Sequence, residues 1–285
     1  MKLVSFQAAD GPAVGLLTEA GIIDLSQAAP QLPRSMKELL QRYGSDLTGA
    51  VKTKRDVKPI PLAEATLLPV VPDPNKIICI GRNYAAHAAE GGAKPLDYPD
   101  IFMRAATSMV AHNQSIVRPK CSDKLDYEAE LVFIVGQATR HATEENALDA
   151  IAGYSMFNEG SVRDYQRKAT QWTPGKNFDK TGAFGPALVT ADTLPAAMAG
   201  QRIQTRLNGQ TMQDANTDDL IFPVRKLVAI LSEIMTLEPG DVVVTGTPAG
   251  VGYPRNPPVF MKPGDIVEVE VEGLGVLVNT IVDEA

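Results

Sequence analysis

The chain has 285 residues, 44% hydrophobic and 21% charged, which is ordinary for a globular protein in water. Its formal net charge of −7 lacks the positive footprint expected of proteins that bind nucleic acid or an anionic membrane surface. No run approaches the roughly 18 apolar residues of a membrane span, and residues 1–6 lack the apolar core of a secretory signal. We therefore expect a cytoplasmic protein that acts on a small molecule.

Residues 1–70 predict a small leading α+β domain. The spacing of residues 35–43 is helical, and Gly44 is well placed to end that helix. This part of the chain combines no nucleophile, base and metal ligand, so we interpret it as structural. The proline-rich stretch 69–74 predicts a boundary before a second domain at 71–285. Strands are predicted in the first domain at residues 3–6, 13–18 and 21–25.

The second domain is predicted to be rich in strands, with few helices. An Asn208-Gly209 pair indicates a type I′ hairpin turn, and Cys79 lies in an apolar run as a small buried residue. Asp218 or Asp219 is a candidate cap for a helix at 220–234, and residues 93–124 are predicted to be rich in loops. Further helices are predicted at 85–90 and 143–152, and strands at 76–80, 131–135, 153–157, 202–208, 241–245, 266–271 and 275–281.

Three acidic residues alternate just before the apolar strand 131–135. In an extended chain Asp126, Glu128 and Glu130 would share one face at a spacing of roughly 7 Å. Carboxylates this close repel one another, and burial makes each charge costlier. A solvated strand face and a cation site both explain the pattern. The buried strand that follows favours a divalent metal.

A third carboxylate, Glu159, follows the strand predicted at 153–157. Glu128, Glu130 and Glu159 together would supply oxygen ligands without sulfur or imidazole, which favours Mg²⁺, Mn²⁺ or Ca²⁺ over Zn²⁺. Taken alone, Glu159 also fits an ordinary surface residue.

His87 and Glu90 stand three residues apart, on one face of a short helix. A carboxylate beside a neutral imidazole orients it and raises its basicity, which suits a general base. A partly buried, hydrogen-bonded histidine is the alternative. His112 and His141 lie in less distinctive surroundings and are interpreted as bystanders.

Two further loops carry polar candidates. Residues 246–252 are rich in glycine but lack the Lys-Ser/Thr ending of a phosphate-binding loop, so that interpretation fails. A tight turn that presents Thr247 and backbone N–H groups to an anion is still compatible with the pattern. Lys176 could pair with a substrate carboxylate or oxyanion, although a solvated lysine explains it equally well.

Taken in register, five segments resemble the fumarylacetoacetate hydrolase superfamily over roughly residues 70–282. These segments are Ile77–Glu90 with Gly-Arg-Asn-Tyr at its centre, Asp126–Leu131, Asn158–Gln166, Gly175–Asp179 and Gly240–Gly252. The resemblance implies a strand-rich α+β protein, in which a mixed β-roll catalytic domain follows the small N-terminal domain. It also implies a homodimer.

The resemblance assigns roles residue by residue. It implies Glu128, Glu130 and Glu159 as ligands of Mg²⁺ or Mn²⁺, although the third ligand of the family is usually Asp. The extra methylene of Glu159 puts the geometry of that ligand in question. The implied catalytic residues are His87, Glu90 and Lys176, and the implied substrate-binding residues are Arg163, Gln166 and Thr247.

The activity implied is metal-dependent cleavage of a C–C bond in a 2,4-dioxo acid of the acylpyruvate type, giving pyruvate or another 2-oxo acid plus a carboxylic acid. The pair of His87 and Glu90 favours this hydrolysis. An oxaloacetate-type decarboxylase or a dienoate isomerase on the same scaffold is the alternative. A non-catalytic metal- or ligand-binding member is a second alternative.

Overall fold

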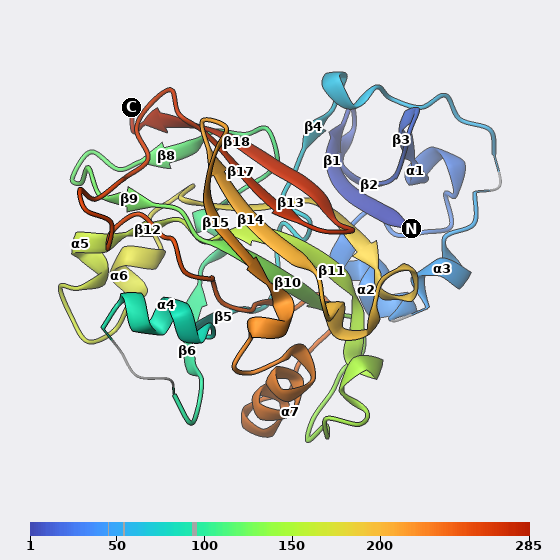
Figure 1. The fold of residues 1–285 in the computed structure, drawn as a ribbon. Coiled ribbons are helices and arrows are strands. Elements are labelled where there is room, and N and C mark those ends of the chain that lie inside the picture. The colour runs from blue at the N-terminus through green and yellow to red at the C-terminus, as the bar shows by residue number, and fades with distance from the viewer. Residues whose placement is uncertain (45, 54, 93–95) are drawn as a thin grey trace.

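The computed structural model describes residues 1–44, 46–53, 55–92 and 96–285 (Figure 1). Its strands are β1 Lys2–Ala8, β2 Gly11–Thr18, β3 Gly21–Asp24, β4 Thr66–Leu67, β5 Ile77–Gly81, β6 Asp100–Arg104, β7 Met109–Val110, β8 Ile116–Arg118, β9 Leu125–Asp126, β10 Ala129–Val135, β11 Ile151–Asn158, β12 Ser161–Val162, β13 Gly182–Thr190, β14 Arg202–Leu207, β15 Gln210–Asn216, β16 Val242–Val244, β17 Ile266–Val271 and β18 Gly275–Asp283. Its α-helices are α1 Leu25–Ala28, α2 Met36–Tyr43, α3 Leu47–Ala50, α4 Ala85–Glu90, α5 Arg163–Gln166, α6 Thr173–Lys176 and α7 Val224–Ile234.

The strands form a large mixed sheet and two smaller sheets. The large sheet has 11 strands, with the order β3-β2-β1-β13-β11-β10-β16-β5-β6 and with β4 and β7 paired to its side. Most of its neighbours are antiparallel, while β16 runs parallel to β5. A five-stranded sheet, β15-β14-β17-β18-β8, packs against it, and β12 pairs with β9. The prediction of a strand-rich α+β fold is confirmed.

Strand β10 lies in the middle of the large sheet and is buried along its whole length. Because side chains alternate between the two faces of a strand, β10 contributes to two cores. Leu131, Phe133 and Val135 pack with β14, β17 and α7, while Val132 and Ile134 pack with α2 on the other side. The residues directly before β10 are thereby held at the centre of the molecule (Figure 1).

The N-terminal strands belong to the same large sheet. Strand β1 pairs with β13 through Lys2 and Leu3, and β2 and β3 extend the sheet beyond it. In Figure 1 this blue segment lies at one side, next to α2 and α3. The division at residue 70 therefore stays a prediction, with a sheet that runs across it.

Several sequence-based predictions are confirmed. Ser35 caps α2 and Gly44 ends it with a φ of 49°. The hairpin between β14 and β15 turns at Asn208 and Gly209, which both have positive φ as a type I′ turn requires. Cys79 is fully buried. Among the described residues, no helix is long and apolar enough to cross a membrane.

The helix predicted at 143–152 is wrong. Only a 3₁₀ turn forms, at Ala147–Ala150, and the chain enters β11 at Ile151. The side chain of Asn146 accepts a hydrogen bond from the N–H of Thr143, 2.8 Å away, which closes a turn instead of starting a helix. Pairing of β11 with both β10 and β13 outweighs the helical spacing of this segment.

Two other local predictions need correction. Asp218 and Asp219 lie in a 3₁₀ turn capped by Asn216, and α7 begins later, directly after Pro223. Proline suits the N-terminal side of α7 because its fixed φ is compatible with helix entry.

The stretch 93–124 contains β6, β7 and β8 in addition to loops, and its residues 93–95 lie outside the described residues.

Candidate active site

Three buried carboxylates meet where β10 and β11 lie side by side. The acceptor oxygens of Glu128, Glu130 and Glu159 all lie within 4.8 Å of one another. Residues 129 and 158 are partners in the β10–β11 ladder, and the N–H of Glu159 donates to the carbonyl of Glu128, 2.8 Å away. All three glutamates are buried, with exposures of 3% or less. The alternative of a solvated strand face is therefore wrong.

Three buried cations surround this cluster. Lys176, at the end of α6, donates through Nζ to Glu128 Oε2 at 2.7 Å and also contacts Glu159 Oε2. Arg163 Nη2 lies 2.7 Å from Glu128 Oε1. Arg104 Nη1 lies 2.7 Å from Glu159 Oε1. Burial by itself would raise the pKa of Glu128, but Lys176 and Arg163 outweigh it and hold that pKa well below its ordinary value.

Glu130 is placed differently from the other two carboxylates. Among the residues that the structure describes, no lysine or arginine forms an ion pair with it, and its Oε2 accepts from the N–H of Gly246. Burial, together with the neighbouring Glu159 and Glu128, raises the pKa of Glu130 well above its ordinary value. A buried carboxylate that faces two others and lacks a cation fits a divalent metal ion.

The donor set therefore fits a hard cation. It consists of carboxylate oxygens, the ligands that Mg²⁺ and Mn²⁺ prefer. Arg104 holds Oε1 of Glu159, so Oε2 is the oxygen turned toward the cluster. A glutamate suits this position better than the shorter aspartate that is usual in the family, because the extra reach of Glu159 lets it contact Arg104 and the other two carboxylates at once.

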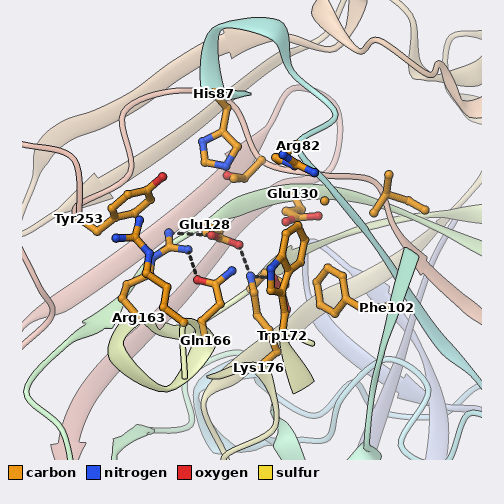
Figure 2. A pocket seen from close by; sticks show the side chains of 15 residues that line it. Arg82, His87, Phe102, Glu128, Glu130, Arg163, Gln166, Trp172, Lys176 and Tyr253 are labelled. Atoms are coloured by element: carbon orange, nitrogen blue, oxygen red, sulfur yellow. Dashed lines mark hydrogen bonds and ion pairs between the residues drawn. The ribbon is translucent and has the colours of Figure 1, made fainter. Parts of the chain in front are cut away.

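His87 and Glu90 form the expected pair on α4. His87 Nδ1 lies 2.8 Å from Glu90 Oε1, and the N–H of Gly250 donates to Glu90 Oε2 at 2.9 Å. An ionised carboxylate only accepts, so Nδ1 carries the proton and Nε2 is left as the basic nitrogen. His87 is 9% exposed and lies above Glu128 in Figure 2.

Asp126 does not join the cluster of three carboxylates but holds the pocket residue Arg163. Its Oδ2 accepts from Arg163 Nε at 2.8 Å, and its two oxygens also accept from the N–H groups of Gly252 and Tyr253. Arg163 Nη1 in turn donates to Gln166 Oε1 at 3.0 Å. These bonds fix two of the predicted substrate-binding side chains relative to the loop at 250–253.

One cavity of about 150 Å³ unites these groups. It is lined by every predicted site residue except Glu90, which stands behind His87. Trp172 and Phe102, whose ring centroids are 5.5 Å apart, form an apolar wall beside Lys176 (Figure 2). Pockets for drug-sized ligands measure about 300–1,000 Å³, so this smaller cavity suits a compact ligand.

Two residues that shape the site, Arg104 and Gln213, were not predicted from the sequence. Arg104 lies in a stretch predicted as loop, and Gln213 lies on a strand far from every motif. Both are nonetheless buried against the site residues, with exposures of 4% and 1%. His112, interpreted as a bystander, accepts from the N–H of Val278 through Nδ1 at 3.1 Å.

Curated relatives match nearly the whole chain. The protein named Oxaloacetate tautomerase Fahd2a, mitochondrial, from Rattus norvegicus is 39% identical over 288 residues, covering 99% of this chain and 92% of the rat protein. Oxaloacetate tautomerase fahd2, mitochondrial, from Xenopus laevis is 40% identical over 290 residues, covering 99% of this chain and 90% of its own.

These names contradict the expected cytoplasmic location, because both relatives are named mitochondrial. The expectation rested on the missing apolar core of a secretory signal. Mitochondrial targeting segments are amphipathic and rich in arginine, so an apolar core is not one of their features.

Solved structures share the fold. Fumarylacetoacetate hydrolase from Exiguobacterium antarcticum is 33% identical with a TM-score of 0.86, and the match covers 100% of both chains. Maleylpyruvate hydrolase from Sphingobium sp. SYK-6, in complex with manganese(II) and pyruvate, is 27% identical with a TM-score of 0.82 and covers 100% of both chains.

The family model described as "Fumarylacetoacetate (FAA) hydrolase C-terminal" matches residues 76–282. That range contains the three carboxylates, the His87–Glu90 pair and the cavity. The chain belongs to the fumarylacetoacetate hydrolase family and, with its relatives, is an enzyme of that superfamily.

Proposed function

We propose that this enzyme is a divalent-metal-dependent tautomerase that interconverts the keto and enol forms of oxaloacetate. The observation that carries the proposal is the meeting of one oriented imidazole and three buried carboxylates in a cavity of about 150 Å³. The names of the relatives supply the substrate. This isomerisation is closer to the alternative drawn from the sequence than to hydrolysis, which was its main prediction.

Glu128, Glu130 and Glu159 would hold the metal, and Mg²⁺ or Mn²⁺ is the proposed ion. The manganese in the maleylpyruvate hydrolase supports this choice. When bound, such an ion supplies Lewis-acid polarisation of a 2-oxo group.

Proton transfer falls to the chain's own residues. His87 Nε2 would take a proton from carbon 3 of the keto form, and the imidazolium would deliver it through water to the oxygen at carbon 2. The reverse transfers convert enol to keto, so no atom is gained or lost. Glu90 keeps Nδ1 protonated throughout and so holds the tautomer that this exchange needs.

Lys176 would act as a cation and not as a base. Burial alone would lower the pKa of Lys176, but Glu128 and Glu159 outweigh it and raise that pKa. The ammonium group is therefore charged at neutral pH. It would stabilise negative charge that develops on the substrate oxygens.

The test follows the decay of enol absorbance after enol oxaloacetate is mixed with the purified enzyme and Mg²⁺ or Mn²⁺. We expect the enzyme to accelerate this decay over the rate with the metal alone. A chelator should remove the acceleration, and the His87→Ala variant should show no acceleration. Release of pyruvate in the same mixture would instead identify a decarboxylase. A decay rate equal to that of the heat-denatured control would overturn the proposal.

Hydrolysis of an acylpyruvate is the second candidate. The oriented imidazole of His87 also suits activation of water, and the maleylpyruvate hydrolase shares the fold. Release of pyruvate plus a second carboxylic acid from maleylpyruvate or acetylpyruvate would establish this reaction. Metal binding without turnover of any of these acids would point to the non-catalytic alternative.

We also propose a homodimer that needs no nucleic-acid or membrane partner. Strand β6 ends the large sheet, and among the described residues its only strand neighbour is β5. Met103 on β6 is 41% exposed and nearby Tyr98 is 53% exposed, so a partner has apolar surface to cover. Size-exclusion chromatography with light scattering should give twice the mass of one chain, which is 30.5 kDa. A measured mass equal to that of one chain would contradict the dimer.

A further inference from the structure

Gln213 occupies the interior of the molecule, directly behind the cavity. It lies on β15 and is 1% exposed. Its Oε1 accepts from the N–H of Ala129 at 2.9 Å and from Thr205 Oγ1 at 2.6 Å. Its Nε2 donates to the carbonyl of Pro248 at 2.7 Å and to Thr247 Oγ1 at 2.8 Å.

These contacts fix the orientation of the amide. The N–H of Ala129 can only donate, and the carbonyl of Pro248 can only accept. Turning the amide over would place two acceptors together at Pro248 and two donors together at Ala129. Nε2 therefore faces Thr247, and the oxygen of that hydroxyl is the acceptor.

The direction of this bond decides what Thr247 can do. A hydroxyl has one proton, and because its oxygen receives the N–H of Gln213, that proton is left to donate elsewhere. Within the described part of the chain, the Thr247 hydroxyl has no other hydrogen-bond partner, and Thr247 lines the cavity together with Lys176 and Arg163.

We infer that Gln213 is a positioning residue that makes Thr247 a hydrogen-bond donor to an anionic oxygen of the substrate. The same amide holds Ala129, which lies between the carboxylates Glu128 and Glu130. It thereby sets the place of the hydroxyl relative to the metal cluster. The inference rests on the proposed function only for the identity of the acid.

The probe is pyruvate, the ligand in the maleylpyruvate hydrolase structure. Its dissociation constant on the Mn²⁺-loaded full chain is read from paramagnetic broadening of the methyl NMR signal, which needs no turnover. An enzyme that binds pyruvate but leaves oxaloacetate unchanged would refute the proposed function and still test the inference. A wild-type chain that does not bind pyruvate would overturn the inference.

The hydroxyl is tested first. We expect Thr247→Val to weaken pyruvate binding by about tenfold or more, since a hydrogen bond to a charged group is lost. Thr247→Ser keeps the hydroxyl on Gln213 and should bind within about threefold of wild type. Equal affinities of Thr247→Val and wild type would overturn the inference, whether or not any variant at position 213 folds.

The glutamine is tested next. In Gln213→Met the carbonyl of Pro248 loses its donor and competes for the Thr247 proton, so affinity should fall about as far as in Thr247→Val. Adding Gln213→Met to Thr247→Val should then cost little more. An equal loss in both backgrounds would show that Gln213 acts through something other than Thr247.

Thr205→Val is the matched control. It removes a bond on the carbonyl side of the same glutamine and leaves the contact with Thr247 in place. We expect lower thermal stability with pyruvate affinity within twofold of wild type. A loss of affinity as large as that of Gln213→Met would mean that general loosening of the core, and not the direction of the hydroxyl, explains the effect.

Discussion

Arg104 is the residue that gives Glu159 a fixed direction. Its guanidinium contacts Glu159 Oε1, the carbonyl of Gly160, and the hydroxyls of Thr181 and Ser108, all in the buried interior. These four bonds use all three nitrogens of a rigid planar group, two of them coming from Nη1. If Glu159 binds a metal as proposed, Arg104 would orient its carboxylate before the ion arrives.

Replacing Arg104 should therefore damage metal binding. We expect Arg104→Met to weaken Mn²⁺ binding by about 10- to 100-fold, as for other partners of metal ligands. The unfolding free energy should also fall by about 3–5 kcal/mol, because a buried carboxylate loses its cation. Calorimetric titration and urea unfolding measure the two effects. Arg206→Met, which breaks partly exposed ion pairs on β14, should leave Mn²⁺ affinity unchanged.

His87 should separate chemistry from metal binding. His87→Ala removes the base but no ligand, so turnover should fall by about 10²- to 10⁴-fold while Mn²⁺ affinity stays within about twofold. Glu128→Ala should do the reverse and lower metal affinity first. A large loss of Mn²⁺ affinity in His87→Ala would show that the imidazole helps to hold the ion.

At this scale the sequence revealed charges but not their partners. Glu128 and Glu130 stood out because alternating acids beside a buried strand need an explanation. Arg104 and Gln213 did not, since each meets the site only after distant segments pack together. No local pattern marks an arginine at the end of a strand as the partner of an acid 55 residues away.

At the scale of elements, β10 and β11 determine the site. Their ladder pairs Ala129 with Asn158 and so brings Glu159 beside Glu128. The apolar run of β10 was sufficient to predict this strand. The start of β11 could not be predicted in the same way, because Ile151 and the alanines before it fit a helix equally well until the two neighbouring strands are known.

The contact between His112 and Val278 within β18 predicts a stability that depends on pH. Burial lowers the pKa of His112, whose Nδ1 accepts from the N–H of Val278. Below the ordinary value of 6.5 the unfolded chain binds a proton that the folded chain resists, so stability falls as the pH falls. Above 6.5 the effect is absent. His112→Asn keeps an acceptor without a titrating group and should flatten the stability curve below pH 6.5.

Urea unfolding across this pH range measures the effect. His141→Asn is the control, because His141 is exposed and its positive φ of 56° is one that asparagine tolerates. It should leave the slope of stability against pH unchanged. Equal slopes for wild type and His112→Asn would contradict the assignment.

At the scale of the whole molecule, a metal bound at the cluster should stabilise the fold. Binding to the folded state alone contributes about 2.7 kcal/mol when the ion is present at about 100 times its Kd. The melting temperature should then rise by roughly 5 °C over that of the chelated protein. Differential scanning calorimetry measures this rise. Glu130→Gln should abolish it, and a variant that still responds would place the ion elsewhere.

The ladder between β10 and β11 has a consequence for how fast the molecule forms. Asn158 lies 30 residues from Glu128, and the cluster also needs Lys176 and Arg104 from two other elements. We therefore expect the three carboxylates to come together late in folding, after the long-range strand pairing that limits the folding rate. Mn²⁺ should slow unfolding and leave refolding unchanged in stopped-flow experiments. Refolding that accelerates with Mn²⁺ would mean that the ion gathers its ligands before the sheet exists.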